Sequence, residues 1–229
     1  MLPDAIIFDL DGTVADTESI EYRSVARVWA DHDLPFGEDR WAHVIGQSWS
    51  PEWVGELQLA VRTRDRIELT ADDLHRIQHD YKAVMLKELV PRPGIVELLD
   101  AARGAEIPLG IASNSSLRWV ETRLAQVGLS DHFDVISAVD TASHPKPDPA
   151  PYREACEFFG ARPDHSVAFE DSTTGTASAV AAGLFTIVCP GPLTEGHDLG
   201  LAHLTVRSHE ELSLASVCTA LEDWLNGRR

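Results

Sequence analysis

The sequence predicts an α/β fold in which a parallel sheet is interrupted by a helical insertion. Three observations lead to this prediction: an apolar run near the N-terminus, a long helical stretch behind it, and then short apolar runs that alternate with amphipathic helices. Such alternation is typical of βαβ units, and these units build parallel sheets.

The first predicted strand is Ala5-Ile6-Ile7-Phe8, and Asp9-Leu10-Asp11-Gly12-Thr13 follows it. The apolar run is continuous rather than alternating, as in strands buried on both faces of a parallel sheet. Asp11-Gly12 favours a turn, because glycine tolerates positive φ. Both aspartates are therefore expected at the carboxyl edge of the sheet, where open α/β sheets bind their ligands.

The helical insertion follows this first strand. Between residues 17 and 89 no run resembles a strand, and the pattern indicates helices separated by turns. Thr70 and Ser50 stand where helix N-caps are expected. Pro91-Arg92-Pro93-Gly94 then predicts the hinge through which the chain returns to the sheet.

The remainder of the chain alternates between strands and helices. Strands are predicted at residues 109–112, 135–136, 166–169 and 186–189. Helices are predicted at residues 117–127 and 149–160, and the small residues between Gly175 and Gly183 predict a helix packed closely on the sheet.

The composition limits the class of protein. The 229 residues, 44 % of them apolar, suffice for one large domain or one domain with an insertion. A formal charge of −18 repels nucleic acid and anionic lipid, so an anionic substrate would need a local positive site. Cys156, Cys189 and Cys218 match no metal motif, and no apolar stretch approaches ~20 residues. We expect a cytoplasmic protein with no membrane and no nucleic-acid partner.

Three later segments place polar groups directly after predicted strands, at residues 112–115, 145–149 and 169–175. If the strand ends meet at one edge, they gather a single set of side chains: Asp9, Asp11, Ser113, Lys146, Glu170 and Asp171. Carboxylates packed so closely repel one another unless a cation neutralises them, and oxygen ligands suit Mg²⁺. A lysine inside this acidic set indicates that an anion also enters.

Four segments follow one another along the chain: Asp9-Leu10-Asp11-Gly12-Thr13, Ser113, Lys146 and Glu170-Asp171. In this order they resemble the four motifs of the haloacid dehalogenase-like superfamily of phosphotransferases. Each motif alone is unspecific, but the four in order are specific. The resemblance spans nearly the whole chain. It implies a Rossmann-like three-layer core, residues 1–16 and 89–229, and an inserted α-helical cap domain, residues 17–88.

The resemblance implies a role for both aspartates. Asp9 matches the nucleophile that attacks phosphorus and becomes an aspartyl phosphate; a carboxylate is already ionised at neutral pH and needs no base. Asp11 matches the general acid and base, which protonates the leaving alcohol and then deprotonates water. Because halide leaves carbon without a proton, Asp11 also favours phosphoryl transfer over dehalogenation.

The same resemblance implies a magnesium site and a phosphate site. The carboxylates of Asp9 and Asp171 and the backbone carbonyl of Asp11 match Mg²⁺ ligands, with Glu170 close by or acting through water. Lys146 matches the cation that offsets repulsion between the nucleophile and the phosphate. The Ser113 hydroxyl and the Asn114 backbone N–H match groups that hold the remaining phosphate oxygens.

Three functions remain open at this stage. The first is a phosphatase that hydrolyses a small phosphate monoester, such as a sugar or polyol phosphate. The second is a phosphohexomutase: the similar β-phosphoglucomutases carry a histidine where this chain has Glu21, and basic residues beside a cap glycine, whereas the loop around Gly46 has none. The third is a binding or regulatory relative without turnover, which the intact Asp9 and Lys146 disfavour.

Within the insertion, Gln47 and Trp49 are predicted to select the leaving group, and the partner is expected to be a small phosphorylated metabolite. The tryptophans crowded there are expected to build a small helical core rather than to stack on substrate. His75 and His79 are expected on a solvated helix face rather than on a metal. A monomer or a homodimer is expected.

Overall fold

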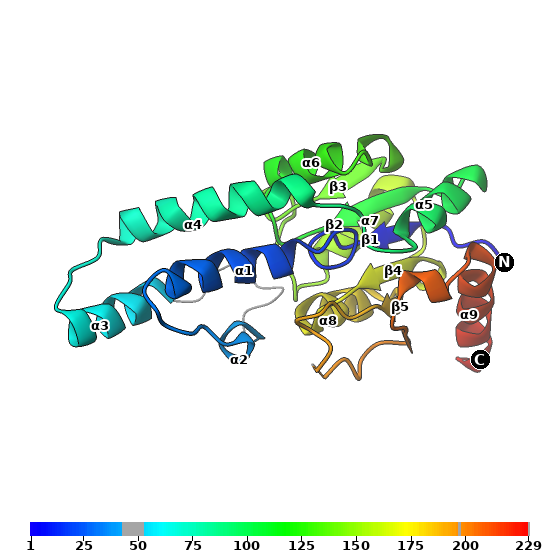
Figure 1. The fold of residues 1–229 in the computed structure, drawn as a ribbon. Coiled ribbons are helices and arrows are strands. Elements are labelled where there is room, and N and C mark those ends of the chain that lie inside the picture. The colour runs from blue at the N-terminus through cyan, green and yellow to red at the C-terminus, as the bar shows by residue number, and fades with distance from the viewer. Residues whose placement is uncertain (43–52, 197, 229) are drawn as a thin grey trace.

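The structure is a computed structural model that describes residues 1–42, 53–196 and 198–228 (Figure 1). Across these ranges the chain forms one sheet of six parallel strands in the order β3-β2-β1-β4-β5-β6. The strands are β1 (Ile6–Phe8), β2 (Leu109–Ala112), β3 (Val135–Ser137), β4 (Val167–Glu170), β5 (Phe185–Val188) and β6 (Leu204–Thr205). The predicted N-terminal strand is central, and each of its residues is buried.

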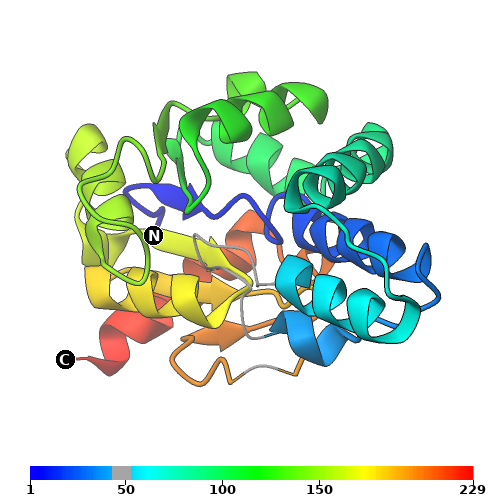
Figure 2. The same cartoon turned by 90° about the vertical axis from the view of Figure 1, so that its left-hand side faces the viewer.

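Helices cover both faces of the sheet (Figure 2). Because successive side chains of a strand point to opposite faces, Ile6 and Phe8 pack in one apolar cluster and Ile7 in another. The first cluster includes residues of α5 (Ile95–Gly104), α6 (Leu117–Gln126) and α9 (Leu214–Gly227). The second includes residues of α7 (Ala150–Phe159) and α8 (Thr173–Ala182). The predicted Rossmann-like three-layer α/β core is therefore confirmed.

The segment after β1 is helical, as predicted, and its helices are α1 (Thr17–Ala30), α2 (Glu38–Ala42), α3 (Trp53–Asp65) and α4 (Ala71–Met85). Figure 1 shows α1 and α4 side by side, extending away from the sheet. The Thr70 side chain accepts a hydrogen bond from the Asp73 N–H, which confirms the predicted N-cap. The second predicted cap, Ser50, lies outside the described residues.

These helices have an apolar cluster of their own. Trp29, Trp41 and Trp53 are buried in it, so the prediction of a small helical core is confirmed for them. Trp49 lies outside the described residues. His75 and His79 are exposed on α4, which confirms the predicted solvated face.

The connections into and out of the helical segment run beside each other. Ala15 forms an isolated antiparallel bridge with Pro91, and the backbone N–H of Arg92 donates to the carbonyl of Val14 at 2.8 Å. The η1 turn (Leu86–Glu88) links α4 to the returning chain. Among the described helices, none is both long and apolar enough to span a membrane.

His209, at the start of the η4 turn (His209–Glu211), gives the fold a pH dependence. Its ring is buried beside Phe169, with ring centroids 5.9 Å apart. Burial, and then the positive charge of Arg92, lowers the pKa of His209 from 6.5 to about 4. Between these values the folded protein keeps His209 neutral while the unfolded chain binds a proton. The contribution of the neutral His209 to the free energy of unfolding is therefore fully present above pH 6.5 and decreases as the pH falls towards 4.

Between pH 7 and pH 5 we expect His209 to cost about 2 kcal/mol of unfolding free energy. This contribution can be measured by urea denaturation of the wild type and of His209→Leu at both pH values. It is the difference between the two proteins in how the free energy of unfolding changes with pH. Parallel pH dependences in the two proteins would contradict the assignment to His209.

Candidate active site

The candidate active site lies at the carboxyl edge of the sheet, where its central strands end. Asp9 directly follows β1, which lies between β2 and β4. Ser113 follows β2, whereas Glu170 ends β4 and Asp171 comes next. The strand order changes direction between β1 and β4, and open α/β sheets bind ligands at such a switch point.

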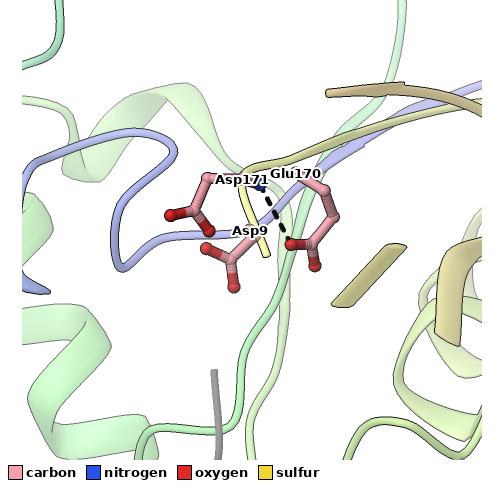
Figure 3. Close-up of side chains that lie close together, drawn as sticks. All are labelled: Asp9, Glu170 and Asp171. Atoms are coloured by element: carbon pink, nitrogen blue, oxygen red, sulfur yellow. Dashed lines mark hydrogen bonds between the residues drawn. The ribbon is translucent and has the colours of Figure 1, made fainter. Parts of the chain in front are cut away.

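Three buried carboxylates meet at this edge. Asp9, Glu170 and Asp171 each offer one oxygen, and these oxygens lie within 4.8 Å of one another. Figure 3 shows the three side chains together, with the backbone N–H of Asp171 donating to Glu170. Burial, with repulsion from Glu170 and Asp11 added, raises the pKa of Asp9 to about 8 although Lys146 opposes the shift. Burial and repulsion from Asp9 also raise the pKa of Asp171 well above its usual range.

A fully buried oxygen of this cluster has no hydrogen-bond partner. It is Oδ2 of Asp9, which is buried. A buried, unpartnered carboxylate oxygen beside two further carboxylates is a costly arrangement for the protein alone. A hard divalent cation supplies the missing partner and neutralises the repulsion, so the donor set fits Mg²⁺.

Lys146 supplies the positive charge inside the acidic cluster. Its Nζ lies 2.8 Å from Asp9 Oδ1 and 2.6 Å from Glu170 Oε1. Burial opposes the charged ammonium, but the two carboxylates outweigh it and raise the pKa of Lys146. The Asn114 side chain fixes the lysine backbone: its Oδ1 accepts from the Lys146 N–H at 2.8 Å, and its Nδ2 donates to the Lys146 carbonyl at 3.0 Å.

Asp11 lies in a different environment from Asp9. Its carboxylate accepts hydrogen bonds from Thr17 Oγ1 at 2.5 Å, Ser115 Oγ at 2.6 Å and Trp119 Nε1 at 2.9 Å. These bonds fix its side chain apart from the three clustered carboxylates. A cavity of about 40 Å³ lies beside both aspartates, and it is also lined by Glu18, Ser113, Asn114, Ser115, Lys146 and Ser172.

Two glycines allow the carboxylates to approach the backbone. A Cβ atom at Gly175 would lie 1.9 Å from Glu170 Oε1. At Gly12, where φ is +93°, a Cβ atom would lie 2.1 Å from Asp171 Oδ2. Any larger residue would displace Glu170 or Asp171, so these positions require glycine.

The structure adds residues that the motifs do not identify. Tyr152 donates its hydroxyl to Glu170 Oε1 at 2.6 Å. Arg92 donates to the carbonyls of Gly12, Cys189 and Pro190, at 2.5, 2.8 and 2.9 Å, and so joins the first motif to the loop after β5. An arginine inside a predicted hinge was the only sequence signal for this role.

Glu18 is a further titratable group that the motifs do not identify. It lies on the first turn of α1 and lines the cavity beside the aspartates. Burial, with repulsion from Asp11 and Glu21, raises the pKa of its carboxyl group to about 8. Besides Asp9, Glu18 is therefore a carboxyl group beside the site that can hold a proton near neutral pH.

The motif residues lie close together at the carboxyl edge of the sheet, as predicted. Seven residues named from the sequence meet at this edge: Asp9, Asp11, Ser113, Asn114, Lys146, Glu170 and Asp171. Their catalytic roles stay predictions. Gln47 and Trp49, and the loop around Gly46, lie outside the described residues.

Comparison with known proteins places this arrangement in a family. The family model "Haloacid dehalogenase-like hydrolase" matches residues 6–189. Phosphorylated carbohydrates phosphatase from Thermotoga maritima is 30 % identical, over 79 % of this chain and 82 % of its own length. β-Phosphoglucomutase from Bacillus subtilis is 28 % identical, over 92 % of each chain.

A solved structure extends this similarity to three dimensions. Mutant CbbY from Rhodobacter sphaeroides, in complex with xylulose-(1,5)bisphosphate, is 29 % identical with a TM-score of 0.73, over 93 % of this chain and 97 % of that chain. The match to the family model covers more than half of the chain, including all the motif residues. The chain belongs to the haloacid dehalogenase-like hydrolases.

Proposed function

We propose that this hydrolase is a Mg²⁺-dependent phosphatase that cleaves a small phosphate monoester, a sugar or polyol phosphate, through an aspartyl phosphate on Asp9. One observation carries the proposal. Asp9 has a lysine ammonium 2.8 Å from one oxygen and no hydrogen-bond partner on the other, while Asp11 is held separately beside it. The proposed nucleophile Asp9, the proposed phosphate-binding cation Lys146 and the proposed general acid Asp11 thus lie close together.

In the proposed metal site, the carboxylates of Asp9 and Asp171 and the backbone carbonyl of Asp11 would hold Mg²⁺, with Glu170 nearby. The unpartnered Asp9 oxygen and the clustering within 4.8 Å support this assignment. When bound, the ion offsets the repulsion between the Asp9 carboxylate and an incoming phosphate.

In the first proposed step, an Asp9 oxygen attacks phosphorus and the bond to the alcohol oxygen breaks. Asp11, in its protonated form, gives its proton to that oxygen, so the alcohol leaves neutral. Lys146, the Ser113 hydroxyl and the Asn114 backbone N–H hold the phosphoryl oxygens as they gain charge.

In the second proposed step, water attacks phosphorus and its proton passes to the Asp11 carboxylate. The bond between phosphorus and Asp9 breaks, which releases inorganic phosphate and restores both aspartates. Two easier transfers thereby replace one direct attack of water.

We further propose that residues 17–88 form a cap domain over a core of residues 1–16 and 89–229. The separate apolar cluster of α1–α4 and the paired connections at Ala15 and Pro91 support this division. Closure of the cap would exclude water and select the alcohol. A sugar or polyol phosphate is supported by the names of the phosphatase relative and of the ligand in the similar solved structure. Gln47 and Trp49, in the loop around Gly46, are still proposed to select the leaving group.

The mutase alternative is less well supported. Glu21, at the position where the similar mutases carry a histidine, accepts a hydrogen bond from Gln78 at 3.0 Å and pairs with Lys82. A carboxylate engaged with α4 does not supply the imidazole that the similar mutases carry at this position. A binding protein without turnover would have no use for the intact pairing of Asp9 with Lys146.

Phosphorus NMR with a panel of hexose, pentose, glycerol and nucleoside monophosphates tests the proposal. With Mg²⁺ we expect the signal of inorganic phosphate to grow, and to grow fastest when the substrate is a sugar or polyol phosphate. EDTA should stop the reaction, and excess Mg²⁺ should restore it, because the carboxylate cluster repels a phosphate without the cation. Conversion of β-glucose 1-phosphate, with a trace of the 1,6-bisphosphate, into the 6-phosphate would identify a mutase instead.

A further inference from the structure

A second cavity, of about 460 Å³, lies where α4 and η1 meet α6. Figure 1 shows the end of α4 reaching α6, and the Gln126 side chain donates to the Leu86 carbonyl across this junction. We call it the α4–α6 cavity, and it is lined by His79, Lys82, Ala83, Leu86, Lys87, Trp119, Arg123 and Gln126. Its size is that of a site for a small metabolite.

The charge of this cavity is opposite to that of the protein. The chain carries a net charge of −18, yet none of the eight lining residues is acidic and three of them are lysine or arginine. Lys82 pairs with Glu21, which offsets its charge. Within the described part of the chain, Lys87 and Arg123 form no ion pair.

Arg123 is the most informative of these cations. Its buried Nε atom has no hydrogen-bond partner, and burial lowers the pKa of the guanidinium group although the negative charge of Asp11 opposes the shift. Its other contact is with the Trp119 ring, where Cζ lies 4.6 Å from the ring centroid. A partly buried guanidinium with no acidic side chain hydrogen-bonded to it is costly, and a bidentate oxyanion is the ligand that matches its geometry.

We propose that the α4–α6 cavity binds a small metabolite that carries two phosphate groups, held by Arg123 and Lys87 with Lys82 beside them. Two phosphate groups fit better than one because the cations come from both sides of the junction, Lys87 from η1 and Arg123 from α6. The cavity is distinct from the 40 Å³ cavity beside Asp9, and no residue lines both.

Trp119 connects the two cavities. Its ring lines the α4–α6 cavity, with Lys82 Nζ 4.4 Å from the ring centroid, while its Nε1 donates to Asp11. A bound anion that draws Lys82 and Arg123 towards itself would change the contacts of the ring. The indole N–H of Trp119 is therefore a reporter of occupancy.

Pyrophosphate, titrated in the absence of divalent cations, is the probe that tests this site. Without a cation the carboxylates around Asp9 repel an anion, so the α4–α6 cavity is tested alone. We expect calorimetry to detect one site and the Trp119 indole signal, followed in ¹⁵N-tryptophan-labelled protein, to shift. Inorganic phosphate should bind more weakly than pyrophosphate; equal affinity would overturn the assignment to a ligand with two phosphate groups.

Three variants identify the residues that bind. Arg123→Gln should weaken pyrophosphate binding by about 10-fold or more, because a charge-assisted hydrogen bond is lost. Lys87→Gln, at an exposed position where folding is not at risk, should also weaken it. Arg118→Gln is the matched control, since Arg118 is exposed on the same helix and does not line the cavity.

Equal affinities in Arg123→Gln, Lys87→Gln and Arg118→Gln would overturn the proposal, as would a Trp119 signal that does not move. Because no turnover is measured and no metal is present, these outcomes do not depend on the proposed phosphatase activity.

Discussion

Replacing Asp9 with asparagine is expected to lower the rate of phosphate-ester hydrolysis by at least about 10⁴-fold, because the amide is not a nucleophile. Two neighbouring carboxylates are engaged in other contacts: Asp11 accepts three hydrogen bonds, and Glu170 is bonded to Lys146 and Tyr152. Steady-state release of inorganic phosphate with Mg²⁺ measures the effect.

The fold of Asp9→Asn should persist, because the amide has the same shape and Lys146 keeps its contact with Glu170. Removing one carboxylate from the cluster also relieves repulsion with Asp171. Urea denaturation checks this point. Asp164→Asn, on the exposed η3 turn (Pro163–His165), is the matched control and should leave the rate unchanged. Hydrolysis that survives in Asp9→Asn would exclude the aspartyl-phosphate mechanism.

The core of the site could be predicted from the sequence because each part has a local signal. The continuous apolar run before Asp9 identifies a central strand, and Asp11-Gly12 identifies the turn after it. Glu170 follows from a similar local pattern, whereas Lys146 follows from the order of the motifs, since β3 already ends at Ser137. Parallel strands then bring their carboxyl ends to one edge, so the order of the motifs along the chain is sufficient to place them together.

The supporting residues could not be predicted, because their contacts join distant parts of the chain. Trp119 lies 108 positions from Asp11, and Arg92 lies 80 positions from Gly12 and 97 from Cys189. No local pattern indicates where such side chains point, since packing of the completed fold decides it. Strand β6 was missed for a related reason: its two residues, Leu204 and Thr205, are not fully buried and form no apolar run.

The two aspartates show how one turn creates two chemical environments. Asp9 is buried with Lys146 and Asp171 beside it, where the proposed mechanism needs a charged carboxylate to attack phosphorus. Asp11 instead accepts hydrogen bonds from hydroxyl and indole groups, which carry no charge and fix the orientation of its carboxylate beside Asp9. This difference supports the proposal that Asp9 is the nucleophile and Asp11 the acid and base.

Asp11→Asn therefore tests the second role. We expect kcat to fall by about 10²- to 10⁴-fold, because an amide neither protonates the leaving alcohol nor accepts a proton from water. A substrate with a good leaving group, such as an aryl phosphate, needs little protonation and should still phosphorylate Asp9. Its hydrolysis step remains slow, so the phosphorylated enzyme should accumulate and be visible by mass spectrometry after an acid quench.

Trp119→Phe is the matched comparison, because it removes one hydrogen bond to Asp11 and leaves the carboxylate in place. Loss of one positioning contact should reduce kcat far less, by about 10-fold or less, without accumulation of phosphorylated enzyme. Should Asp11→Asn lose activity on every substrate with no phosphorylated Asp9, Asp11 would be needed for a reason other than protonation of the leaving alcohol, which would contradict its role as general acid. Unchanged kcat would move the acid and base role to another group, and Glu18 beside the cavity would be the next candidate.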